Sequence, residues 1–253
     1  MFFDRQPVAD FARLVSSYNL GEFASPYRST IPLLSLLKDG EPALVKVLGA
    51  LGVGSGASLH IEYKTDPTRG VGKPSQTDLM VKAAGAAWAI EAKWTEPRYE
   101  TVAARVARDL DASNRRDIVQ GWLELIQPYA LRRLDMTLVE SLVYQMVHRA
   151  ASACGATAKP ALVYLVFHTE SVGGHPRKDF YRADLTLFHN ALGSPAGFPF
   201  YLADLGLKST AAFRAIEALR KGVESTAERV RQALLGERLF EFGIPVVTAL
   251  RGG

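Results

Sequence analysis

Alternation of apolar and polar residues marks three consecutive β-strands in the first half of the chain. Between Ala57 and Thr65 every second side chain is apolar, which is the period of a half-buried strand. Asp78–Ala83 and Ala86–Trp94 alternate in the same way on either side of Ala84-Gly85, a pair short enough for a hairpin turn. The pattern therefore predicts a strand, a loop over Asp66–Thr77, and an antiparallel hairpin.

Further apolar runs predict later strands, and helical spacing predicts the helices. The β-branched and aromatic run Ala161–Phe167 is typical of a central buried strand, and shorter strands are expected at Phe200–Asp204 and Ile244–Leu250. Apolar residues three and four apart predict helices elsewhere. The expected helices are residues 8–20, Ser29–Lys38, Glu41–Leu51, Tyr99–Tyr129 with an interruption near Asp111–Asn114, Thr137–Cys154, Lys178–Ala191, and two between Thr210 and Leu235.

The order helix, three strands, helix, strand predicts an α/β fold. The chain has 253 residues without an internal repeat, a low-complexity tract or a convincing linker, so we expect a single domain over residues 1–253. Hydrophobic residues make up 48% and charged residues 22% of the chain, which is ordinary globular usage rather than the profile of a disordered protein.

Net charge and cysteine content bear on the expected partners and the expected cellular compartment. A net charge of +4 slightly favours phosphate-bearing partners. The lone Cys154 excludes an intrachain disulfide, and the first five residues lack the features of a secretory signal. The longest apolar run is far shorter than the about 20 residues that span a bilayer. We therefore expect a cytoplasmic protein without a membrane span.

The hairpin brings three ionisable residues together. If Ala84-Gly85 forms the turn, Asp78 lies directly opposite Glu91, and Lys93 shares their face because it is two residues away. A slip by one residue would bury these charges, so the apolar residues of the other face fix the register. Those residues are Leu79, Val81, Ala83, Trp88, Ile90 and Ala92.

Two carboxylates this close repel each other unless a positive charge lies between them. A hard divalent cation, Mg²⁺ or Mn²⁺, meets that need, because it takes oxygen ligands and leaves positions for waters and a substrate phosphate. Such a metal polarises a phosphoryl group and activates a water. Lys93 would either hold or deprotonate that water or stabilise charge on the phosphate.

The segment Thr77-Asp78, twelve residues, then Glu91-Ala92-Lys93 resembles the motif of the PD-(D/E)XK nuclease superfamily, which includes restriction endonucleases. The resemblance implies Asp78 and Glu91 as metal ligands, Ala92 as a ligand through its backbone carbonyl, and Lys93 as the catalytic lysine. Thr77 departs from the proline that many members have there.

The resemblance extends to the fold and the substrate. It implies a restriction-endonuclease-like αβββαβ core with a mixed sheet over about residues 41–168, with extra N-terminal elements and a C-terminal elaboration over 169–253. It implies a Mg²⁺-dependent deoxyribonuclease, most simply an endonuclease, acting on DNA in restriction, defence or repair. It leaves open whether cleavage is endo- or exonucleolytic and whether the chain forms a homodimer.

Accessory residues follow from the same resemblance. Gln145 lies on the helix after the lysine strand, where many members carry a further polar residue. Glu62, on the polar side of the preceding strand, is a candidate third acidic metal ligand, with a solvent-facing glutamate as the alternative. Glu22 or Glu41 would otherwise fill that role.

Two groups of cations are candidate nucleic-acid contacts. Seven arginines between residues 98 and 133 alternate with acidic residues, and we expect them to form a solvated helical surface. They are Arg98, Arg105, Arg108, Arg115, Arg116, Arg132 and Arg133. Residues 175–182 mix cations with aromatics, which suits gripping a backbone or stacking a base, although an ordinary helix start has the same composition.

The main alternative is a catalytically inactive module of the same type that binds nucleic acid or a protein partner. Retention of all three site groups favours the enzyme over that module. Gly52–Gly56 is not a dinucleotide-binding fingerprint, because the run leads from a helix into a strand and not the reverse.

Overall fold

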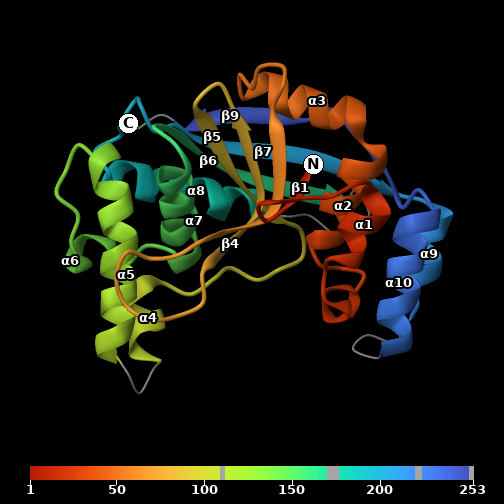
Figure 1. Ribbon diagram of the computed structural model, residues 1–253, viewed down its shortest axis with the longest axis horizontal. Coiled ribbons are helices and arrows are strands. Elements are labelled where there is room, and N and C mark those ends of the chain that lie inside the picture. Colours follow the sequence, from red (N-terminus) through yellow and green to blue (C-terminus); the bar gives the residue numbers. More distant parts are fainter. Residues whose placement is uncertain (109–111, 170–176, 220–223, 251–253) are drawn as a thin grey trace.

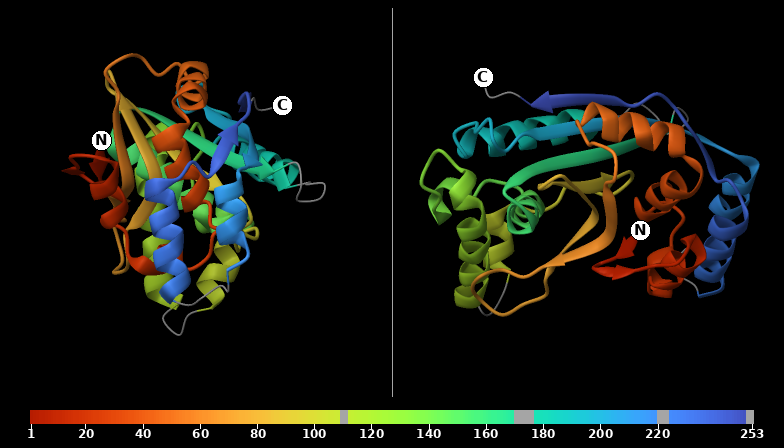
Figure 2. Two further views of the ribbon diagram at one scale, coloured as in Figure 1. Left: turned by 90° about the vertical axis from the view of Figure 1, so that its right-hand side faces the viewer. Right: turned by 45° about the horizontal axis from the view of Figure 1, so that its top comes forward.

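The protein has an α/β fold in which helices cover both faces of one mixed sheet (Figures 1 and 2). The computed structural model describes residues 1–108, 112–169, 177–219 and 224–250. Its nine strands run in the order β2-β1-β3-β4-β5-β6-β7-β8, and β9 also pairs with β7. Most strand pairs are antiparallel, whereas β1–β3, β5–β6 and β6–β7 are parallel.

The strands differ in length and burial. The central strand β6 is buried along almost its whole length, as its near-continuous apolar sequence predicts. The strands are β1 (Phe2–Phe3), β2 (Gln6–Pro7), β3 (Ser58–Thr65), β4 (Ser75–Ala83), β5 (Ala86–Lys93), β6 (Lys159–Thr169), β7 (Phe200–Ser209), β8 (Phe240–Phe242) and β9 (Val246–Leu250).

The helices divide into two layers. One layer, with α4 (Val102–Ala107), α5 (Ala112–Ile126), α6 (Met136–Val139), α7 (Tyr144–Ala156) and α8 (Arg177–Ala191), packs on one face of the sheet. The other layer, with α1 (Phe11–Ser16), α2 (Thr30–Asp39), α3 (Glu41–Ala50), α9 (Ala211–Glu217) and α10 (Glu224–Gly236), packs on the opposite face. Short 3₁₀ turns occur at Leu20–Phe23 and Gln127–Tyr129. Within the described part of the chain, no helix combines the length and apolar character that crossing a bilayer requires.

The β4–β5 hairpin has the predicted register. Ala83 pairs with Ala86, and the ladder continues to Leu79 opposite Ile90. Ala84 and Gly85 both have positive φ, +47° and +76°, which is the backbone of a type I′ turn. The apolar side of the hairpin packs on the α1–α3 layer, so its other side, which carries Glu91 and Lys93, faces α7. The ladder ends before the expected Asp78–Glu91 pair, and the Asp78 side chain instead accepts a hydrogen bond from the Ala92 backbone N–H of β5.

Several predicted boundaries were wrong. Part of the expected loop Asp66–Thr77 is strand, because Ser75 and Thr77 pair with Thr65 and Tyr63 of β3. The expected helix Thr137–Cys154 is interrupted, because Val143 is extended and forms a β-bridge with Thr101. Strands β1, β2 and β8 were not expected, because two or three residues are too few to show an alternating pattern.

The alternation of β3 reverses in the middle of the strand. Glu62 has φ +54°, a left-handed conformation that is rare for a residue with a side chain. As a result Ile61 packs in the core beneath α1–α3, whereas Tyr63 packs in the core beneath α7. The expectation of one apolar and one polar side along Ala57–Thr65 was therefore wrong, and Glu62 marks the point of change.

Candidate functional site

The site lies where β4 and β5 meet under α7. Glu91 and Lys93 alternate with apolar residues on β5, so both point to the same face of the sheet. Helix α7 crosses that face, and its polar residues Gln145 and Arg149, four apart, point down at the two strands. Only 2% of Glu91 and 3% of Lys93 is exposed, so the charges of this site must be satisfied inside the protein.

Glu91 is the centre of a buried polar network. Its Oε1 accepts hydrogen bonds from Lys93 Nζ at 2.8 Å and from Gln145 Nε2 at 2.7 Å. Its Oε2 accepts from Arg149 Nε. Burial alone would raise the pKa of Glu91, but the charges of Arg149 and Lys93 hold that pKa below its usual value. Glu91 is therefore a carboxylate at neutral pH.

Asp78 lies beside this network, and the surrounding charges shift its pKa in the opposite direction from that of Glu91. Its Oδ2 accepts a hydrogen bond from the backbone N–H of Ala92 at 2.8 Å. Burial and then the neighbouring charge of Glu91 raise the pKa of Asp78 well above its usual value, and Arg149 offsets only part of the shift. A cation that approached Asp78 would relieve this cost.

Glu62 occupies the next position across the sheet. The β3–β4 ladder pairs Ile61 with Leu79 and Tyr63 with Thr77, so Glu62 and Asp78 are the residues between these two pairs. Burial raises the pKa of Glu62 to about 7. Two neighbouring carboxyl groups therefore both have disfavoured ionised forms in this corner of the site.

A hard divalent cation suits these donors. Among the described residues, no three His, Cys, Asp or Glu side chains lie close enough to form a metal site by themselves. Mg²⁺ needs only one or two carboxylates, since waters and substrate phosphates complete its octahedron. Asp78 and Glu62 are the carboxyl groups whose ionised forms the protein compensates least, so a cation would stabilise them, whereas Glu91 is already paired with two cations.

Arg149 connects Glu91 to a second polar group at the start of β4. Its Nη1 donates to Ser75 Oγ at 2.8 Å and lies 3.1 Å from His148 Nδ1. Because a guanidinium can only donate, this Nδ1 is an acceptor, and the ring carries its proton on Nε2. Ser75 Oγ also lies 2.8 Å from His148 Nδ1 and accepts from Ser152 Oγ at 3.0 Å.

Comparison with known proteins identifies a family. The model of a domain of unknown function, DUF6946, matches residues 8–199. The chain belongs to this family. No curated protein and no solved structure matches the chain. The part that DUF6946 covers contains Glu62, Asp78, Glu91, Lys93 and Arg149, whereas β7, β8 and β9 follow it.

Most of the predicted site residues come together. Asp78, Glu91, Lys93 and Gln145 share one network or its immediate edge, and Ala92 contributes its N–H to Asp78. Glu22 pairs with Arg28, and its negative charge also helps to raise the pKa of Glu62, so it lies near the edge of the site. The placement of the Glu41 side chain lies outside what the structure describes.

The arginines predicted as nucleic-acid contacts include some in surface ion pairs and some that line a pocket. Arg98 pairs with Asp184, and Arg108 with Glu100, as expected of surface residues. Arg105 and Arg115 instead line a pocket. Residues 175 and 176 of the predicted stretch 175–182 lie outside the described residues, and so do the side chains of residues 177 and 178. Tyr181 is buried and its ring contacts the ring of Tyr164.

Sequence reasoning missed two members of the site. Ser75 lay within the expected loop Asp66–Thr77, and no role was predicted for Arg149. The four-residue spacing of Gln145 and Arg149, both polar on an otherwise apolar helix side, was the available signal.

Proposed function

We propose that the protein is a Mg²⁺-dependent nuclease that hydrolyses phosphodiester bonds of DNA. One observation carries the proposal: Asp78, Glu91 and Lys93 lie at one point of two adjacent strands, and Gln145 donates to Glu91 from the helix above. Carboxylates, an ammonium group and an amide in this arrangement match the chemistry of metal-assisted phosphodiester hydrolysis.

We also propose that residues 41–168 form a restriction-endonuclease-like core. The elements α3, β3, β4, β5, α7 and β6 follow one another in the order of the restriction-endonuclease-like core, with α4, α5 and α6 inserted between β5 and α7. Support comes from the pairing, since β3, β4 and β5 form an antiparallel meander and β6 joins β5 in parallel.

Each residue has a proposed role. Asp78 and Glu62 would hold the metal, with the backbone carbonyl of Ala92 as a further ligand, and Glu91 would join them only by giving up one of its protein donors, Lys93, Gln145 or Arg149. When bound, the metal would polarise the phosphate and activate a water. Lys93, which forms a 2.8 Å ion pair with Glu91, would stabilise charge on the phosphate as an ammonium group. Gln145 and Arg149 orient the Glu91 carboxylate.

A second candidate is a catalytically silent module that binds nucleic acid or a protein partner. The observation that favours it is the engagement of both Glu91 oxygens by protein donors, which gives this carboxylate a structural role without any metal. Metal binding separates the two candidates, because a silent module has no need of Mg²⁺.

The deciding experiment combines calorimetry with a cleavage assay. The wild type should bind Mg²⁺ or Mn²⁺ and cut plasmid or single-stranded DNA. Asp78→Asn, which keeps an oxygen for the Ala92 N–H, should lose both metal binding and cleavage. Lys93→Met should lose cleavage alone. The matched control is Lys82→Met, a partly exposed lysine of β4 that contacts Tyr63.

Two outcomes would contradict the nuclease proposal. A folded wild type that binds neither metal at millimolar concentration and cuts neither substrate would favour the silent module. Cleavage that survives in Asp78→Asn would place the active site elsewhere in the molecule.

A further inference from the structure

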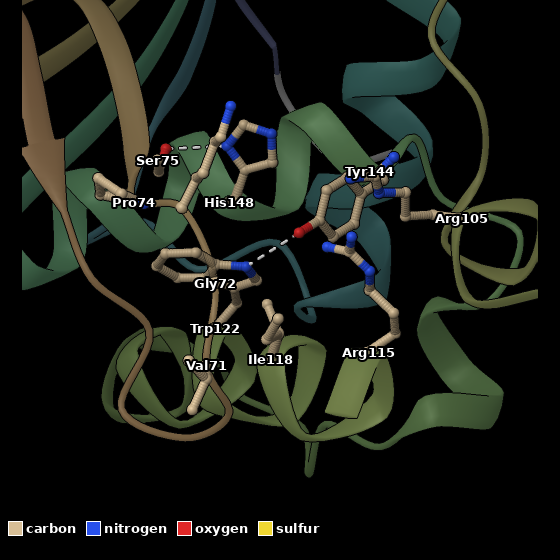
Figure 3. Close-up of a pocket in the computed structure, with 11 residues that line it drawn as sticks. Val71, Gly72, Pro74, Ser75, Arg105, Arg115, Ile118, Trp122, Tyr144 and His148 are labelled. Atoms are coloured by element: carbon tan, nitrogen blue, oxygen red, sulfur yellow. Dashed lines mark hydrogen bonds between the residues drawn. The ribbon is translucent and has the colours of Figure 1, made fainter. Parts of the chain in front are cut away.

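We propose that the pocket beside Ser75 and His148 binds a nucleotide of the DNA strand that is cut, holding its phosphate with cations and its base against aromatic rings. The inference rests on the proposed function and names a substrate contact outside the carboxylate site. The pocket measures about 540 Å³ and lies between residues 71–75, α4, α5 and the start of α7 (Figure 3).

The charge of the pocket selects an anion. Lys73, Arg105 and Arg115 line it, and no carboxylate is among the described lining residues. Arg105 also pairs with Glu100 at 3.4 Å, so part of its charge is compensated. A phosphate group is the anion that guanidinium and ammonium groups recognise in nucleic acids, and such contacts supply most of the affinity.

Aromatic rings form another wall of the pocket. Tyr144 and His148 are half-buried on α7, with ring centroids 5.0 Å apart, and the Trp122 Nε1 donates to Tyr144 Oη at 3.4 Å. Figure 3 shows Tyr144, Trp122 and Arg115 pointing toward the same space. Cations beside aromatic faces are typical of sites that hold a phosphate and stack an unpaired base.

The wall formed by residues 70–73 is held against α5. Asn114 makes two hydrogen bonds to the backbone of Val71, at 2.8 and 2.9 Å. Gly70 has φ +76°, and a Cβ there would lie 2.8 Å from the backbone nitrogen of Ile118, so only glycine allows this close approach. The pocket is therefore built into the fold and does not depend on a ligand to form it.

The pocket adjoins the carboxylate site through Arg149. Ser75 and His148 line the pocket and contact Arg149 Nη1, while Arg149 Nε donates to Glu91. One guanidinium thus separates the pocket wall from Glu91.

The test measures binding without turnover. A 5′-phosphorylated single-stranded 12-mer is titrated in EDTA over a series of salt concentrations, with inorganic phosphate as the comparison ligand. Lys73→Glu should weaken 12-mer binding at least about tenfold and reduce the slope of log K against log salt by about one. Tyr144→Leu should weaken binding at least about fivefold. The control Lys46→Glu, an exposed lysine of α3 with the same charge change, should bind as the wild type does.

The outcomes separate this inference from the proposed nuclease. If Lys73→Glu and Tyr144→Leu bind the 12-mer as tightly as Lys46→Glu, the inference is overturned even if the wild type cuts DNA. If phosphate competes at Lys73 but Tyr144→Leu has no effect, the site is an anion site and the base contact is refuted. Pocket-dependent binding by a wild type that never cuts would sustain the inference and refute the nuclease.

Discussion

Arg149 on α7 donates from Nε to Glu91 on β5, so the helix that covers the sheet neutralises the carboxylate beneath it. Both residues are buried, and a buried charge is stable only with a partner. The same guanidinium reaches Ser75 at the wall of the pocket. The pair therefore has a structural role in the metal-free protein and lies between the two proposed functional features.

Replacing Arg149 should destabilise the protein and strengthen its response to metal. Arg149→Met leaves Glu91 with only Lys93 and Gln145, so we expect a loss of about 3 kcal/mol in the free energy of unfolding. Millimolar Mg²⁺ should then raise the Tm more in Arg149→Met than in the wild type, because the cation no longer competes with the guanidinium. Equal Tm shifts in both proteins would show that metal does not bind at Glu91.

Replacing Glu62 with glycine should stabilise the fold and weaken metal binding. A left-handed residue with a side chain costs about 1 kcal/mol, and glycine removes that cost. Glu62→Gly should therefore raise the free energy of unfolding by about 1 kcal/mol in EDTA, while it reduces Mg²⁺ affinity. Lys64→Gly is the control, because its ordinary strand backbone gains nothing from glycine and should lose about 0.5–1 kcal/mol. A destabilised Glu62→Gly protein would contradict the prediction.

The hairpin turn offers a stabilising substitution away from the site. Ala84 has φ +47° at the first central position of a type I′ turn, where asparagine is favoured before glycine. Ala84→Asn should raise the free energy of unfolding by about 0.5–1 kcal/mol in a denaturant titration. Ala83→Asn, a strand position next to the turn, should lower it. A gain in both variants would rule out the turn as the cause.

His148 should make the protein sensitive to mild acid. Burial, and then the charges of Arg149, Lys93 and Arg105, hold the pKa of His148 well below its usual value. In the unfolded chain a histidine takes up a proton near pH 6.5, so below that pH the unfolded state binds more protons and stability falls.

The measurement compares the wild type with His148→Asn, whose amide oxygen can replace the Nδ1 acceptor. Between pH 7.5 and 5.5 the wild type should lose about 1.4 kcal/mol more of its unfolding free energy than the variant loses. Other titrating groups cancel in this comparison. Identical pH slopes for the two proteins would mean that His148 can be protonated in the folded state.

Local sequence patterns determined the hairpin and the charged groups at its face. A two-residue turn fixes the register of Asp78–Ala83 and Ala86–Trp94, and a side-chain period of two then assigns every residue to a face. The shared face of Glu91 and Lys93 follows from these two facts alone, whereas the expected pairing of Asp78 with Glu91 is not part of the ladder. The buried strand β6 and the α/β order were predictable for the same reason, since each depends on short stretches of chain.

Only the tertiary structure decided what surrounds these groups. The Arg149–Glu91 pair joins residues 58 apart, and the Asn114–Val71 contact joins residues 43 apart. The reversal of β3 at Glu62, the extension of β4 back to Ser75 and the pairing of Phe2 with His60 each depend on which strands lie side by side. A periodic pattern reports the burial of a segment but not its neighbour, so the charge balance of the site and the existence of the pocket came from the fold.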